Sequence, residues 1–201
     1  GYVDRVDTTT NASLLTKDLS LKIINAGLDR INISIEGMNS KQYLDFSRAK
    51  LDFNKLVENI AFLYENRNQC EIIIKINGDI INEEQKEEFY NVFGDIADGV
   101  NIESVMSCWP EFELDNVNVN MDRGIYGQNI KEVMVCPYVF YSMSINSSGM
   151  ASACYLDWER KLIIGDANKE RVKDIWNGEP MNDLRKLFLM KKRKSHPICK
   201  D

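Results

Sequence analysis

The stretch RINISIE, residues 30–36, alternates apolar and polar side chains without interruption. Its isoleucines would occupy one face of a β-strand, and its asparagine, serine and glutamate the other face. The run IIIKIN, residues 72–77, has a similar pattern, with Lys75 and Asn77 on the polar side. A short strand is expected over residues 2–9, and apolar residues at helical spacing lie between the two runs. Asn82 opens a further acidic helix, with Gln85 three residues on, as in a capping box. This alternation predicts an α/β fold in which helices connect parallel strands.

The polar face of these strands has two explanations. A parallel strand covered by helices on both faces is usually apolar on both. In a β/α barrel, the polar face lines the lumen, and ligands bind near the C-terminal ends of the strands. In an open sheet, it is the face of an edge strand that meets water. The pattern alone favours neither explanation.

Three of the five cysteines, Cys136, Cys154 and Cys199, lie in the last third of the chain. A β-hairpin expected over residues 138–155, with its turn at the sequence NSSG, would bring Cys136 and Cys154 together. A helix from Met181 onward would then return the chain toward Cys199. Because thiolates bind iron–sulfur clusters, this pattern suggests a metal site.

Two alternatives to that metal site remain open. The three thiols are ordinary buried cysteines, or they form a zinc site with His196 as a further ligand. For Cys70 and Cys108 we expect structural positions, because each stands alone in the sequence. A long segment without clear periodicity, residues 106–135, is expected to join two domains.

Composition limits the partners of the protein. The formal net charge of −6 and the pI of about 5.0 argue against a broad nucleic-acid or anionic-membrane surface. No apolar run approaches the roughly 20 residues that a membrane-spanning helix needs. No signal peptide is visible, and the odd number of cysteines fits thiols or metal ligands in a reducing cytoplasm. We therefore expect a cytoplasmic protein without nucleic-acid or membrane partners.

The C-terminal cysteines carry a resemblance to a known family. Twelve residues separate Cys136 from Gly149, four separate Gly149 from Cys154, and Cys199 follows later. This constellation resembles the SPASM or twitch module of radical S-adenosylmethionine (radical SAM) enzymes, in which such cysteines bind an auxiliary [4Fe–4S] cluster. The resemblance implies a small α+β module over residues 131–201, with these three cysteines as metal ligands. The family's next cysteine would fall just past Asp201.

The resemblance extends toward the N-terminus. Residues 28–37 are similar to the fourth strand of the radical SAM barrel, and residues 10–12 to the turn after its third strand. It implies that residues 1–130 are the C-terminal portion of a partial (β/α) barrel. Glu36 replaces the commoner aspartate, and Ala12 the usual glycine. The residues implied in S-adenosylmethionine binding are Asn11, Ser34, Glu36 and Arg48, and the candidates for substrate contacts are Asn32, Lys75 and Asn77.

The family's three-cysteine motif for the catalytic cluster does not occur in this sequence. The chain therefore looks like a fragment that begins near the third strand, and alone we expect it to be inactive. The resemblance implies a parent enzyme that uses a 5′-deoxyadenosyl radical to abstract hydrogen from a peptide or small metabolite, with electrons from a donor such as flavodoxin or ferredoxin. The alternative is a non-catalytic binding or structural module whose cysteine site holds zinc or nothing.

Overall fold

The computed structural model describes residues 3–105, 123–131 and 133–199. The described chain forms two compact units, and the division falls between Asn129 and Ile130. We call them the N-terminal unit and the C-terminal unit and describe each by itself. Residues 106–122 of the expected connecting segment, which include Cys108, lie outside the described residues.

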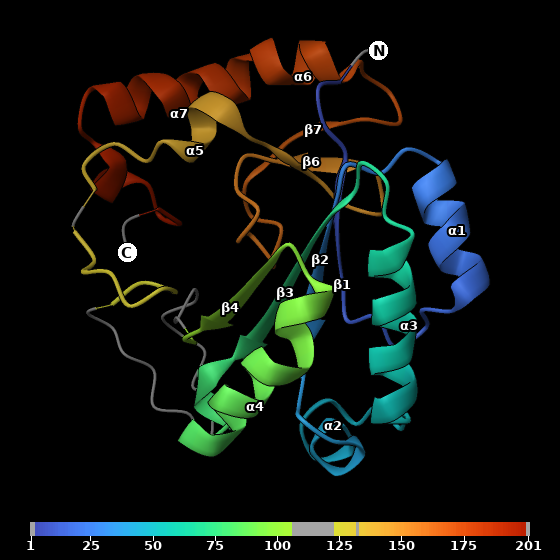
Figure 1. Ribbon diagram of the computed structural model, residues 1–201. Helices are drawn as coiled ribbons and strands as arrows, with labels where there is room; N and C mark the ends of the chain where they lie inside the picture. Colours follow the sequence, from blue (N-terminus) through green and yellow to red (C-terminus); the bar gives the residue numbers. More distant parts are fainter. Residues whose placement is uncertain (1–2, 106–122, 132, 200–201) are drawn as a thin grey trace. The chain divides into compact units, whose positions relative to one another are not determined.

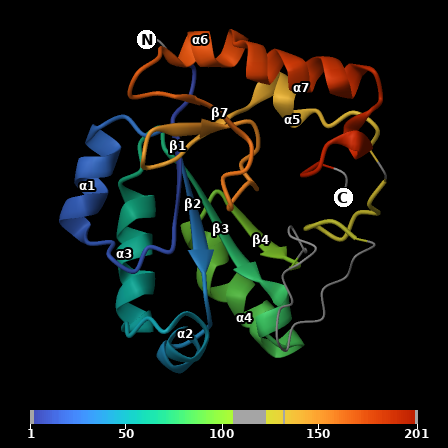
Figure 2. The same ribbon diagram turned by 180° about the vertical axis from the view of Figure 1, so that it is seen from behind.

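The N-terminal unit is an α/β structure with a parallel sheet, as the sequence predicts. Its strands are β1 (Asp7–Thr10), β2 (Arg30–Ile35), β3 (Glu71–Asn77) and β4 (Gly99–Glu103), hydrogen-bonded in that order. Its helices are α1 (Lys17–Asn25), α2 (Ser40–Ser47), α3 (Phe53–Glu65) and α4 (Glu83–Phe93), with short 3₁₀ turns at Gly78–Ile80 and Gly94–Ile96. Figures 1 and 2 show α1, α3 and α4 on one face of the sheet. The first strand, expected over residues 2–9, begins only at Asp7.

The core of this unit lies between that face and the helices. The alternate isoleucines of β2 and β3, at positions 31, 33, 35, 72, 74 and 76, are at most 2% exposed. They pack with Leu63 of α3 and with Phe89 and Phe93 of α4 in one cluster. Burying side chains of this size stabilises the fold by about 1.5–3 kcal/mol each. The alternation of residues 30–36 therefore selects the face on which the helices pack.

Side-chain caps fix where the helices begin. Thr16, Asn39 and Asp52 each accept a hydrogen bond from a backbone N–H of the first turn that follows. Asn82 and Gln85 form the predicted capping box at the start of α4. Such caps satisfy backbone donors that have no partner within the helix. The caps thus fix the first turn of each helix.

The other face of the sheet carries polar side chains in register. Asn32 lies beside Thr9 of β1, and Ser34 lies beside Lys75. Lys75 in turn lies beside Asn101, and Asn77 beside Glu103. We call this the polar face of the sheet.

The C-terminal unit is built on a small antiparallel sheet. Its strands β5 (Ser144–Ile145), β6 (Met150–Ser152) and β7 (Ile163–Asp166) pair in that order. Helices α5 (Tyr138–Tyr141), α6 (Val172–Asn177) and α7 (Glu179–Leu189) and a 3₁₀ turn, Arg193–Ser195, complete it. Gly149 has a φ of +85° in the β5–β6 turn, a conformation that glycine adopts without strain.

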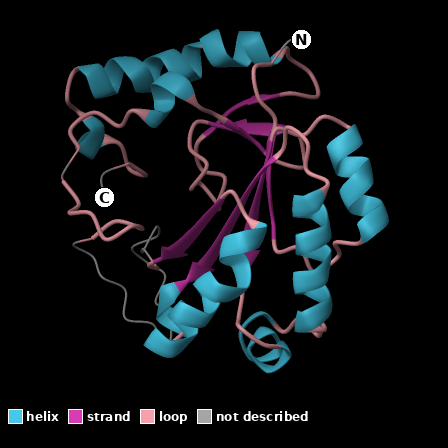
Figure 3. Ribbon diagram, in the orientation of Figure 1, coloured by secondary structure: helices cyan, strands magenta, loops and turns pink. Residues whose placement is uncertain are grey.

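The hairpin is shorter than the sequence suggested. Tyr138–Tyr141 forms a helical turn rather than a strand (Figure 3), because Pro137 precedes it and Ser142 N donates to Tyr138 O at 2.9 Å. Ser142 Oγ donates to the same carbonyl at 3.2 Å. The expectation that Cys136 directly precedes a hairpin strand was therefore wrong. Cys136 instead precedes α5.

None of the helices in the described residues has both the length and the apolar character that a bilayer crossing requires.

Candidate metal centre and polar sheet face

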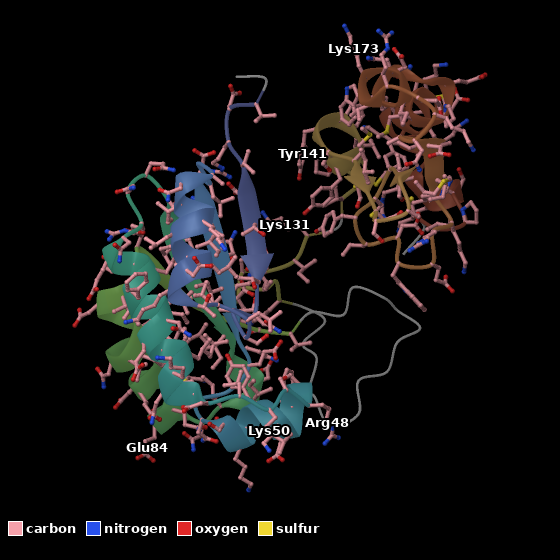
Figure 4. All side chains as sticks on the ribbon, turned by 90° about the vertical axis from the view of Figure 1, so that its right-hand side faces the viewer. Arg48, Lys50, Glu84, Lys131, Tyr141 and Lys173 are labelled. Carbon is pink, nitrogen blue, oxygen red and sulfur yellow. The ribbon has the colours of Figure 1, made fainter. Side chains whose placement is uncertain are left out.

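Three of the residues implied in S-adenosylmethionine binding meet at one end of the sheet. Asn11 follows β1, Ser34 lies near the end of β2, and Glu36 comes directly after β2. The Oε2 atom of Glu36 is buried and has no hydrogen-bond partner. Asn11 is exposed, and its Oδ1 accepts hydrogen bonds from Ser13 N at 3.1 Å and Ser13 Oγ at 2.8 Å. Arg48 is exposed just after α2, with a φ of 60° (Figure 4).

The candidate substrate residues lie in or beside the same polar face. Asn32 Nδ2 donates to Thr8 O at 3.3 Å, and Asn77 Oδ1 accepts from Asp79 N at 2.9 Å. Lys75 Nζ lies 3.0 Å from Glu103 Oε2. The Lys75 and Glu103 side chains are only 28% and 15% exposed, so solvent screens this ion pair weakly.

Two residues of this region were missed by the sequence analysis. Glu103 forms the ion pair with Lys75, and Tyr126 Oη donates to Glu103 Oε1 at 3.2 Å. Burial, followed by the charge of Glu103, raises the pKa of Tyr126. Glu103 occupies a polar position of β4 and was predictable from the alternation, whereas Tyr126 lies in a segment without periodicity.

The three C-terminal cysteines come from different segments of one unit. Cys136 precedes α5, Cys154 follows β6, and Cys199 follows the 3₁₀ turn. All three are free thiols, partly buried, and packed against the same hydrophobic cluster, which includes Val139 and Ile175. Packing on a common core brings thiols that are far apart in the sequence into one region of the unit.

One carboxylate ties the loop that carries Cys154. Ser152 Oγ donates to Asp157 Oδ2 at 2.8 Å, and Cys154 N donates to Ser152 Oγ at 3.3 Å. Asp157 also accepts from Leu162 N at 2.7 Å and from Lys161 N at 2.8 Å. The Asp157 carboxylate therefore holds together the two ends of the loop between β6 and β7, Ser152 at one end and Leu162 at the other.

Two arginines donate hydrogen bonds to the backbone near the other two cysteines, Cys136 and Cys199. Arg193 Nη1 donates to Cys199 O at 2.6 Å, and its Nε donates to Val133 O at 3.0 Å. Arg185 of α7 donates to Val139 O at 2.9 Å, and its guanidinium lies 4.2 Å from the centre of the Trp176 ring. These bonds hold the chain on both sides of Cys136 and the turn at Cys199.

Comparison with known proteins identifies this segment. Residues 136–201 match a family model described as SPASM, an iron–sulfur cluster-binding domain. These residues form a SPASM domain. The match confirms the resemblance drawn from the cysteine spacing.

The solved structures that match the chain include two of BtrN. One is a crystal structure of selenomethionine BtrN in an open conformation, which is 15% identical in sequence with a TM-score of 0.33. The match covers 94% of this chain and 78% of the BtrN chain. A crystal structure of BtrN in complex with AdoMet and 2-DOIA is 16% identical, with a TM-score of 0.37 and the same coverage, 94% and 78%. No curated protein matches the chain.

The thiols of the SPASM domain are electrostatic neighbours. Burial, followed by the charges of Cys154 and Cys136, raises the pKa of Cys199 to about 11. Burial also raises the pKa of Cys154, whereas a hydrogen bond from the backbone of Leu156 lowers it. Burial disfavours the charged thiolate form of these cysteines, and a nearby positive charge, such as that of iron, would stabilise it.

A single ion and a cluster place different demands on the three cysteines. Among the described residues, no group of three or more His, Cys, Asp or Glu side chains is arranged to hold a metal ion. A tetrahedral zinc site would need sulfurs about 3.8 Å apart, given Zn–S bonds of about 2.3 Å. A polynuclear cluster takes its thiolates on different irons and so accepts a wider spacing. His196, the further ligand of the zinc alternative, accepts from Ile198 N at 3.4 Å through its Nδ1, and Nε2 is the other ring nitrogen that can bind a metal.

Proposed function

We propose that the SPASM domain holds an auxiliary [4Fe–4S] cluster on Cys136, Cys154 and Cys199, and that the chain is part of a radical SAM enzyme. The observation that carries this proposal is the SPASM match over the segment that contains all three cysteines. Their packing on one hydrophobic cluster supports it. When bound, such a cluster supplies electron transfer or a site that anchors substrate. The protein's own part is to bind the cluster, fix its position and shield it from water.

In this proposal, S-adenosylmethionine binds at the end of the polar face, and the parent enzyme uses it to abstract hydrogen from substrate. Ser34 and Glu36 contact the cofactor, with Asn11 and Arg48 at its margin. The end of parallel strands is a common place for ligands in α/β folds. The buried, unpartnered Oε2 of Glu36 supports the proposal, because such an atom costs free energy until a donor reaches it.

The substrate, a peptide or a small metabolite, contacts Asn32, Lys75 and Asn77 in this proposal. The ion pair between Lys75 and Glu103 supports a polar substrate, because both partners retain hydrogen-bonding capacity beyond that pair. An electron donor such as flavodoxin or ferredoxin reduces the clusters. These assignments place the chemistry on the polar face and the auxiliary cluster in the SPASM domain.

Iron and acid-labile sulfide analysis after anaerobic reconstitution tests the proposal. About four irons and four sulfides per chain are expected for a [4Fe–4S] cluster. Zinc without sulfide, or no metal, would favour the alternative, a non-catalytic module. The same sample's visible absorbance distinguishes a cluster from adventitiously bound iron.

Glu36→Gln is expected to weaken S-adenosylmethionine binding by about 10- to 100-fold, since a hydrogen bond to a charged group contributes about 1.5–3 kcal/mol. Isothermal titration calorimetry measures the effect. Glu65→Gln, an exposed change at the end of α3, serves as the matched control and is expected to bind normally. Equal affinity of the Glu36 and Glu65 variants would remove Glu36 from the site.

A further inference from the structure

Two side chains of opposite charge are attached to the cysteine segments of the SPASM domain. The Asp157 carboxylate is linked to Cys154 N through a single hydroxyl, that of Ser152, over 2.8 Å and 3.3 Å. The Arg193 guanidinium donates directly to the carbonyl of Cys199 at 2.6 Å. Each charge is therefore held in a fixed position beside one candidate ligand.

Neutral donors hold the carboxylate of Asp157. A serine hydroxyl and the backbone N–H groups of Lys161 and Leu162 donate to it at 2.7–2.8 Å. Such donors stabilise a carboxylate without cancelling its charge, so its field reaches the neighbouring thiols.

Arg193 acts with the opposite sign. Its hydrogen bonds to Cys199 O and Val133 O hold the guanidinium in place at both ends. An arginine keeps its charge across the whole physiological pH range.

We propose that Asp157 and Arg193 set the reduction potential of the SPASM cluster in opposite directions, Asp157 lowering it and Arg193 raising it. This proposal rests on the proposed function, in which the three cysteines hold the cluster. Reduction adds one electron, so a nearby negative charge disfavours the reduced state and a positive charge favours it. Cluster potentials depend on local charge and on hydrogen bonds around the sulfurs. Together, Asp157 and Arg193 would set the cluster's reduction potential in the range that its electron transfer requires.

The test is a redox titration of the reconstituted protein followed by electron paramagnetic resonance. Asp157→Asn is expected to raise the potential and Arg193→Gln to lower it, each by about a tenfold change in the reduction equilibrium, or about 59 mV. Asp174→Asn and Arg171→Gln are the matched controls. They remove the same charges from an exposed ion pair at the start of α6, and the potential should stay unchanged.

Further variants separate charge from loop geometry. Arg193→Lys keeps the charge and should restore most of the potential that Arg193→Gln loses. Ser152→Ala breaks the link to Cys154 N but keeps the carboxylate, so its shift should be smaller than that of Asp157→Asn. Iron content is measured for every variant. If Asp157→Asn retains no iron, the Arg193 variants decide the question.

The outcomes distinguish this proposal from the proposed function. Full iron content with unchanged potentials, or shifts of the same sign for Asp157→Asn and Arg193→Gln, would overturn the charge assignment and leave the cluster proposal standing. A wild-type protein that takes up no iron and sulfide would overturn both. Potential shifts of opposite sign in Asp157→Asn and Arg193→Gln, with no shift in the two control variants, would support the charge assignment.

Discussion

Cys154→Ala is expected to remove most of the iron that the reconstituted protein binds, whereas Cys70→Ala should leave iron content unchanged. Cys154 belongs to the SPASM segment and shares its core with two further cysteines. Cys70 is 1% exposed in the core of the N-terminal unit. A methyl group cannot ligate iron, so loss of one thiolate from a site with three sulfur donors leaves the cluster poorly held. Iron and sulfide per chain, measured side by side, check this expectation.

Folding of the Cys154 variant can be verified independently. The bond that holds its loop is made by the backbone N–H of residue 154 to Ser152 Oγ, so Cys154→Ala retains it. Near-wild-type thermal unfolding of the metal-free variant is therefore expected. Iron content equal to wild type would remove Cys154 from the metal site. An equal loss of iron in Cys70→Ala would point to general destabilisation instead.

The parts of the fold that follow from local rules could be predicted from the sequence. Alternating isoleucines in residues 30–36 and 72–77 gave the strands and the buried face, because the period of two is a property of the strand itself. Asn82 and Gln85 gave the start of α4, because a capping box involves only residues three apart. The cysteine spacing identified the SPASM domain, which the family match confirms.

The parts that depend on tertiary contacts could not be predicted in this way. The run YVFY, residues 138–141, has strand-like composition, yet α5 forms there and Arg185 of α7 donates to its Val139 carbonyl. The role of Asp157 in the Cys154 loop likewise depends on Leu162 and Ser152 meeting one carboxylate. Tyr126 reaches Glu103 across a gap of more than twenty residues in the sequence. No local period signals such contacts.

The second large effect is expected in the N-terminal unit, where adjacent isoleucines of β3 point to opposite faces. Ile74 is 0% exposed and packs in the core under the helices, whereas Ile73 is only partly buried on the polar face. Ile74→Ala is expected to destabilise the unit by about 2–5 kcal/mol, because it removes buried methylene groups and leaves a cavity. Ile73→Ala should cost much less, because less of its surface is withdrawn from water.

Denaturant unfolding followed by circular dichroism, with amide hydrogen exchange of β3 to report on the N-terminal unit, measures both variants. The comparison holds residue type, strand and substitution constant, so the difference in unfolding free energy reports on the two faces alone. A large cost at Ile74 with a small one at Ile73 would mean that the polar face is not needed to hold the unit together. Its polar side chains would then be available to a ligand. Equal costs would mean that the polar face is packed as tightly as the isoleucine face, and the proposed contacts of Ser34, Asn32 and Lys75 with cofactor and substrate would have to be abandoned.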